Sequence, residues 1–120
     1  MKIVSTEAKA ESLQSLQSTI RKSEKALAQM IEKGASTSLI EKRLQALRTG
    51  LAVLEKVWHE QPHPYSQEEL AKTREVLAGL LPSIESMYAK SKSGSPQRTL
   101  LEKRIRSLEL AIKAIDCIFT

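Results

Sequence analysis

Aromatic residues make up only 3% of this 120-residue chain, and Cys117 is its one cysteine. A single cysteine excludes an intramolecular disulfide. With so few aromatic rings, leucine, isoleucine, valine and alanine must fill the interior, which favours helices packed on helices over a β-sandwich or barrel. Hydrophobic residues make up 41% and charged residues 28%, as in an ordinary globular chain. We therefore expect one domain spanning residues 1–120.

Long hydrophobic runs are also missing. No segment approaches the roughly 18 uninterrupted apolar residues that a membrane span needs. The opening stretch carries charged side chains and lacks the apolar run of a secretory signal. With no possible internal disulfide, these absences predict a cytoplasmic protein without a membrane span.

The sequence shows no recognisable catalytic, cofactor-binding or metal-binding motif. Its four glycines are scattered at positions 34, 50, 79 and 94, so no glycine-rich phosphate loop is present. His59 and His63 have the spacing of helical metal ligands, but Pro62 lies between them and ends the helix. We interpret these histidines as part of an exposed connection. We predict a non-enzymatic protein with no cofactor and no metal.

Apolar residues recur every third or fourth position in four segments, which is the pattern of amphipathic helices. Ser5 or Thr6 is placed to cap the first segment, and Gly34 to end it in a left-handed conformation. Ser38 with Glu41, and Ser66 with Glu69, predict capping boxes for the second and third segments. Ser95 and Pro96 are typical of the start of a fourth helix.

The third segment contains Pro82, which removes one helical hydrogen bond. The apolar stripe keeps its phase across this proline, from Leu77 to Ile84. We therefore predict one helix kinked near Pro82 rather than two short helices.

The chain resembles a duplicated helical hairpin; the alternative is that two amphipathic helices of the same period look alike without any duplication. A shift of 61 positions aligns the second segment with the fourth, so that Leu39 meets Leu100 and Trp58 meets Phe119. A shift of 57 aligns the first segment with the third less closely. We predict an all-α fold: an antiparallel up-down-up-down four-helix bundle built from hairpin 6–60, a proline-rich link 61–65 and hairpin 66–119. The heptad-like spacing favours shallow crossing angles near 20°.

The net charge is +5, and basic residues gather between Lys90 and Arg106. Several lie at the start of the fourth helix, where positive charge is unfavourable and a bound anion would be favoured. The stretch has neither interleaved aromatic residues nor a known nucleic-acid motif. The candidate anion-binding or nucleic-acid-binding residues are Arg98, Lys103, Arg104 and Arg106.

A second apolar strip lies beside the main stripes of the second and fourth helices. It is either a wide core-facing surface or an exposed patch that binds a partner. Its candidate partner-binding residues are Leu110, Ala114, Cys117 and Val53.

These patterns together predict a helical protein-protein interaction or adaptor module, with a homodimer as one form of it. The alternative is a small nucleic-acid-associated regulator that uses the basic region 90–106. A further alternative, a small cytoplasmic immunity or chaperone-like protein, rests on size, charge and helicity alone.

Overall fold

The computed structural model describes residues 5–119 and shows four helices and no strand within that range. The helices are α1 (Thr6–Glu32), α2 (Ser38–Trp58), α3 (Gln67–Lys90) and α4 (Pro96–Phe119). The predicted all-α fold is confirmed. Over this range, no helix has the length and apolar character required to cross a bilayer.

Three helices begin where the sequence predicts. The Ser5 hydroxyl accepts from the backbone N–H of Ala8, and Ser66 and Glu69 form a complete capping box. The Ser95 hydroxyl accepts from the backbone N–H of Arg98 at 3.1 Å. Each side chain thereby satisfies a backbone donor that has no partner within its helix.

The start of α2 differs from the prediction. Its N-cap is Thr37, which makes no side-chain cap to the backbone. The Thr37 hydroxyl instead donates to the Glu41 carboxylate at 3.2 Å. The predicted capping box of Ser38 with Glu41 is therefore wrong, because the helix begins one residue earlier than that box requires.

Two helices end in the same hydrogen-bonded motif. After α1, Gly34 has φ +71°, and the N–H of Ala35 donates to the carbonyl of Met30. After α2, Glu60 takes the left-handed position with φ +53°, and the N–H of Gln61 donates to the carbonyl of Lys56. Only glycine adopts this backbone conformation without a steric cost.

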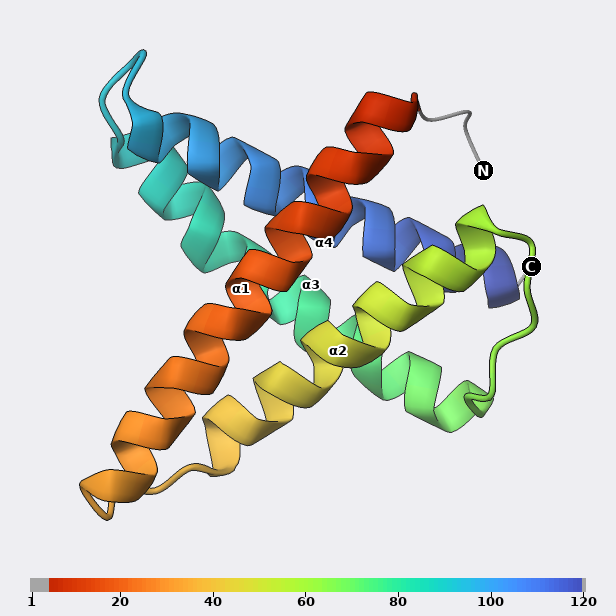
Figure 1. Cartoon of the computed structure of the whole chain (residues 1–120), viewed down its shortest axis with the longest axis horizontal. Helices are drawn as coiled ribbons and strands as arrows, with labels where there is room; N and C mark the ends of the chain where they lie inside the picture. Colours follow the sequence, from red (N-terminus) through yellow and green to blue (C-terminus); the bar gives the residue numbers. More distant parts are fainter. Residues whose placement is uncertain (1–4, 120) are drawn as a thin grey trace.

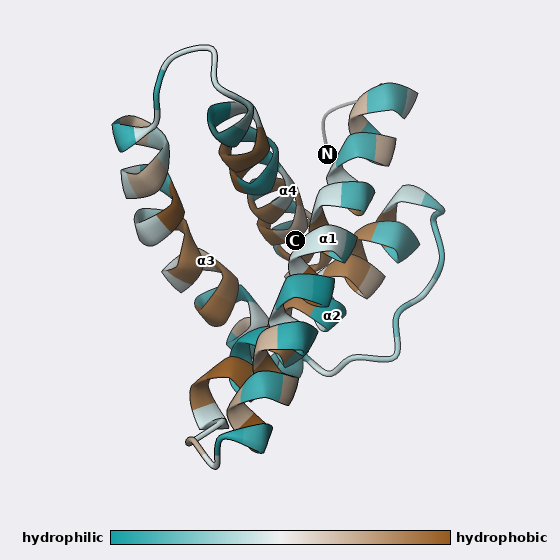
Figure 2. Cartoon of the chain, turned by 60° about the vertical axis from the view of Figure 1, so that its left-hand side comes forward, coloured by the Kyte–Doolittle hydropathy of each residue, from teal (hydrophilic) through white to brown (hydrophobic). Residues whose placement is uncertain are grey.

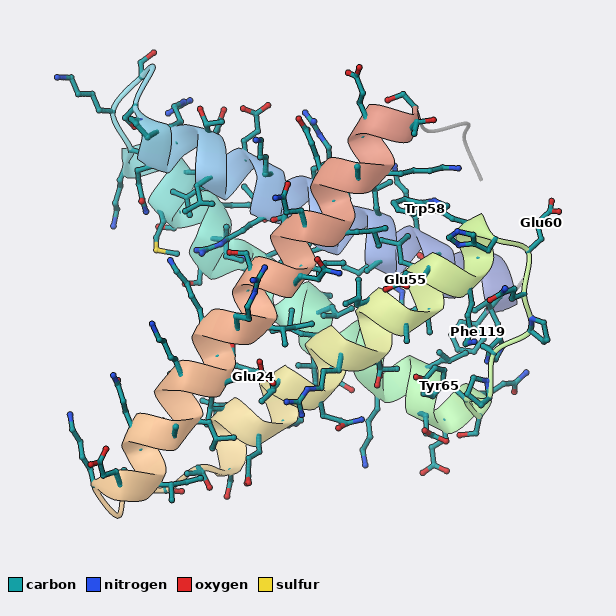
Figure 3. All side chains as sticks on the ribbon, viewed as in Figure 1. Glu24, Glu55, Trp58, Glu60, Tyr65 and Phe119 are labelled. Atoms are coloured by element: carbon teal, nitrogen blue, oxygen red, sulfur yellow. The ribbon has the colours of Figure 1, made fainter. Side chains whose placement is uncertain are left out.

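Glu60→Gly is therefore expected to raise the free energy of unfolding by about 0.5–1 kcal/mol, because relief of the left-handed strain outweighs the greater entropy of unfolded glycine. Chemical denaturation measures the change. Figure 3 shows the Glu60 side chain pointing away from the helices, so little contact is lost. Glu60→Ala is the control, since alanine retains the strain; an equal gain from alanine would contradict this explanation.

The chain folds as two hairpins that lie across one another (Figure 1). Within each hairpin, α1 with α2 and α3 with α4, the helices run in opposite directions. In the described range, α2 and α4 each contact all three other helices, whereas α1 and α3 do not contact each other. The molecule measures 41 × 36 × 21 Å. A single antiparallel bundle with shallow crossing angles is not confirmed by this crossed arrangement.

Helix α3 runs without interruption through Pro82. The prediction of one helix rather than two is confirmed, whereas the kink is not. Upstream of the proline, Leu70 and Leu77 are fully buried. Downstream, Ile84 is only partly buried and Met87 is 45% exposed, so the predicted stripe leaves the core toward the end of the helix.

The core lies where the two hairpins meet. Figure 2 shows hydrophobic residues on the sides of α3 and α4 that face each other and hydrophilic residues outside. Every helix contributes buried aliphatic side chains. The fully or nearly fully buried ones are Leu16, Leu44, Ala46, Leu47, Val53, Leu54, Leu70, Leu77, Leu101, Leu108, Ala111, Ala114 and Ile115.

Gly50 lies at the close approach of α2 to its neighbours. A methyl group placed there would lie 3.0 Å from Cδ1 of Leu77 and 3.6 Å from Cβ of Ala111. Gly50 and Ala111 are equivalent under the shift of 61 that relates the two hairpins. Exchanging α1 with α3 and α2 with α4 also leaves the set of contacting helix pairs unchanged. The arrangement of the helix contacts is thus consistent with the internal similarity of the sequence.

One exposed ion pair joins the helices of each hairpin. Arg48 of α2 contacts Glu24 of α1 at 2.6 Å, and Figure 3 shows Glu24 between those helices. Arg74 of α3 donates to both oxygens of Asp116 of α4, at 2.6 and 3.2 Å. These hydrogen bonds and the negative charge of Asp116 raise the pKa of Arg74 above its ordinary value. Exposed pairs of this kind set the register of helices more than their stability.

Candidate interaction surface

The predicted partner-binding strip does not form one exposed surface. Val53 and Ala114 are fully buried in the core, where no partner can reach them. Leu110 is partly buried and packs against that core. Cys117 is exposed in the last turns of α4. The strip belongs mainly to the wide apolar face that α4 needs, because α4 contacts three helices rather than two.

The basic residue Arg98 binds the chain itself. Its Nη1 donates to the carbonyl oxygens of Tyr88 at 3.1 Å and Ser91 at 3.2 Å. Its guanidinium lies over the Tyr88 ring, 4.0 Å from the ring centroid. Arg98 therefore caps the carboxyl end of α3, whose last carbonyls carry partial negative charge, and fastens it to α4.

Arg98→Ala is expected to lower the free energy of unfolding by about 1.5–3 kcal/mol, because charge-assisted hydrogen bonds and the ring contact are lost together. Thermal and urea denaturation measure the change. Arg98→Lys keeps the charge but not the planar fork, so it should lie between alanine and the wild type. The control is Lys92→Ala, in the exposed turn between α3 and α4. If Arg98→Ala lowers the free energy of unfolding no more than Lys92→Ala does, the assigned role of Arg98 is wrong.

The other basic candidates do not form one free surface either. Arg106 contacts Glu102 at 3.4 Å and Glu11 at 4.0 Å. Lys103 and Arg104 are partly buried. The Nε and Nη2 atoms of Arg104 are buried and have no hydrogen-bond partner among the described residues. Two of the four predicted anion-binding side chains are therefore engaged within the chain.

The two histidines lie near the link between α2 and α3. The Nδ1 atom of His59 lies 2.7 Å from the carbonyl oxygen of Glu55. The Nδ1 atom of His63 accepts from the backbone N–H of Tyr65. The imidazole ring of His63 also stacks with the ring of Tyr65. Across residues 5–119, no three histidine, cysteine or carboxylate side chains gather as metal ligands would. Figure 3 shows Trp58, Tyr65 and Phe119 at this same end of the molecule.

Two adjoining hollows form a groove along α2 and α3, which we call the α2–α3 groove. Their volumes are about 410 Å³ and 250 Å³, and they share Lys42, Lys72 and Val76. The less polar part of the groove lining consists of Leu39, Ala46, Val76, Gly79 and Leu80. The polar part of the lining consists of Lys42, Arg43, Gln45, Thr49, Glu69, Lys72, Thr73 and Glu75. Leu39, at one end, is 59% exposed. Sequence reasoning missed this groove, whose walls come from two hairpins.

The molecule exposes more surface than a compact protein of its size. Its accessible surface is 7795 Å². A compact monomer of the same mass, 13.4 kDa, exposes about 6,500 Å². The hollows between α2 and α3 contribute to this exposed surface.

No protein-family model matches this sequence, and comparisons with curated proteins and with solved structures give no match.

Proposed function

We propose that this chain is a non-enzymatic protein-protein interaction module that binds its partner along the α2–α3 groove. The observation that carries the proposal is the open groove, whose two adjoining hollows are lined in part by the apolar residues Leu39, Val76 and Leu80. Partner proteins recognise such grooves by burying apolar side chains in them. The homodimer predicted from the sequence is one form of this proposal.

The internal repeat supports the choice of groove. When each helix is replaced by its counterpart in the other hairpin, the contact between α2 and α3 corresponds to the contact between α4 and α1. On the α1–α4 side, Ser12 and Ser107 are 2% and 1% exposed, so the helices close over each other. The equivalent of Ser12 is Glu69, an exposed residue in the wall of the groove. The counterpart of Ser107 is Ala46, which is buried as well, so the two copies of this contact differ at Glu69, whose exposed side chain lines the groove on the α2–α3 side.

The nucleic-acid alternative has less support. Arg98 caps α3, and Arg106 is paired with two carboxylates. Nucleic-acid affinity rises with the number of cations free to contact phosphates. The candidate residues would have to give up these internal contacts in order to bind a backbone.

Affinity purification from the cells that naturally produce the chain tests the proposed function. We expect one protein at comparable molar amount, identified by mass spectrometry and reconstituted from two purified components. If the chain is recovered alone and sediments as a monomer, or is recovered only with sub-stoichiometric background that does not bind on reconstitution, the proposal is wrong. A self-associating chain would show its second copy in sedimentation at physiological concentration.

A further inference from the structure

Three cations line the α2–α3 groove and, like most cations of residues 5–119, they form no ion pair there. Among the described residues, Lys42, Arg43 and Lys72 form no ion pair, whereas Arg48 and Arg74 do. All three are exposed and line the same hollow. They are placed to meet the charges of another molecule.

The carboxylates of the groove leave this positive potential only partly balanced. Glu69 is held at the start of α3 by its hydrogen bonds to Ser66. Glu75 is the other acidic group in the lining. Three cations against two carboxylates leave a net positive charge of one along the lining, which favours a negatively charged occupant.

We propose that the α2–α3 groove binds an amphipathic helix from another protein, with carboxylates flanking an apolar stripe. This inference rests on the proposed function and names the chemistry of the partner. The apolar stripe would contact Leu39, Val76 and Leu80, and the flanking carboxylates would pair with Lys42, Arg43 and Lys72.

The dimensions of the groove fit such a helix. Its lining runs from Leu39 to Thr49 on α2 and from Glu69 to Leu80 on α3. At a rise of about 1.5 Å per residue, each wall is about 15 Å long, which corresponds to about three turns of a bound helix. Apolar side chains at positions i, i+3 or i+4, and i+7 of that helix would reach the floor.

A second copy of this chain fits less well. Each copy carries a net charge of +5, so two copies repel each other. In a symmetric dimer built on this groove, Lys42, Arg43 and Lys72 of one copy would approach those of the other. Charge therefore favours a different, acidic protein over self-association.

Gly79 allows a test that leaves the fold intact. It lies in the groove wall, is exposed, and has no atom within 4 Å of the place where a Cβ would stand. Replacing this helical glycine removes a residue of low helix propensity. Gly79→Glu adds a negative charge to the groove, Gly79→Lys adds a positive charge, and Gly79→Ala controls for the side chain alone.

The probes are two synthetic helical peptides of about 18 residues, long enough to be partly helical in water. Both carry leucines every third or fourth position; one is flanked by glutamates and the other by lysines. Binding to the full chain is measured by fluorescence anisotropy at low salt, and the site is mapped by amide chemical shifts. We expect the glutamate peptide to bind at least about tenfold more tightly than the lysine peptide. Shift changes should centre on Ala46 and Val76.

Gly79→Glu should weaken binding of the glutamate peptide at least about tenfold, whereas Gly79→Lys and Gly79→Ala should bind it within about threefold of the wild type. Equal affinity for both peptides, shift changes outside the groove, or no effect of Gly79→Glu would overturn the inference. A wild-type dimer that maps to the groove would also overturn it, because the occupant would then be a second copy.

The two proposals can fail separately. If purification from cells yields a reconstituted partner that Gly79→Glu binds as well as the wild type, the function stands and the choice of groove is wrong. If the glutamate peptide binds the groove but cells yield no partner, the groove chemistry stands and the proposed function is wrong.

Discussion

Gly50→Leu should lower the free energy of unfolding by at least about 2 kcal/mol, even though leucine is the better helix former. Its Cβ would lie 3.0 Å from Cδ1 of Leu77, and the remaining carbons would have to displace Leu77 or separate α2 from α4. Both changes open a close-packed core. Urea denaturation, followed by circular dichroism, measures the loss.

Gly79→Leu is the matched control for this prediction, because the same substitution is made in a helix at an open site. It should raise the free energy of unfolding by about 0.5–1 kcal/mol through helix propensity alone. If both leucine variants are stabilised alike, α2 does not approach its neighbours at Gly50 and the crossing is wrong.

Ala114→Glu should lower the free energy of unfolding by at least about 3 kcal/mol, which is a large part of the stability of a domain of this size. Ala114 is fully buried, so the carboxylate would lie in the core or force α4 away from it. The charged form of a carboxylate is strongly disfavoured there. Circular dichroism and thermal denaturation of the purified variant measure the effect.

The control is Ala10→Glu, the same chemical change at an exposed position of α1, which should alter the free energy of unfolding by about 0.5 kcal/mol or less. Ala114→Glu also separates two interpretations of the fourth helix. If Ala114 belonged to an exposed partner-binding strip, its glutamate variant would fold normally. A stable, cooperatively folded Ala114→Glu would therefore contradict the assignment of Ala114 to the core.

Most of the local structure could be predicted because it depends on short sequence intervals. Ser66 with Glu69, Ser95 and Gly34 act within four residues of their partners, and the structure places each in its predicted role. The exception, at the start of α2, lies in a run of adjacent hydroxyl residues from Ser36 to Ser38. There the side chains compete for one capping position, and periodicity does not distinguish them.

The candidate site could not be predicted in the same way. The burial of Ala114 and Val53 depends on how many helices surround α4 and α2, which the period of one helix does not reveal. The α2–α3 groove depends on the angle at which two hairpins cross. Likewise, Arg98 contacts Tyr88 only because the turn between α3 and α4 brings the two together. These properties arise from tertiary packing.

The internal repeat links the fold to the proposed function. The two similar hairpins pair with each other, so that related helix contacts form between α1 and α4 and between α2 and α3. Small residues such as Ser12 let the first contact close, whereas Glu69 and Lys72 line an open groove at the second. This difference between the two contacts is the asymmetry on which the proposed function depends.

The central claim is that α2 and α4 cross within one chain at Gly50 and Ala111, since both the core and the open groove follow from that crossing. The most direct test is a nuclear Overhauser effect between the Hα protons of Gly50 and the methyl protons of Ala111. It should be recorded on uniformly labelled protein and on a mixture of labelled and unlabelled chains. We predict a strong intramolecular cross-peak and no intermolecular one. Its absence, or its appearance only between chains, would contradict the crossed-hairpin fold.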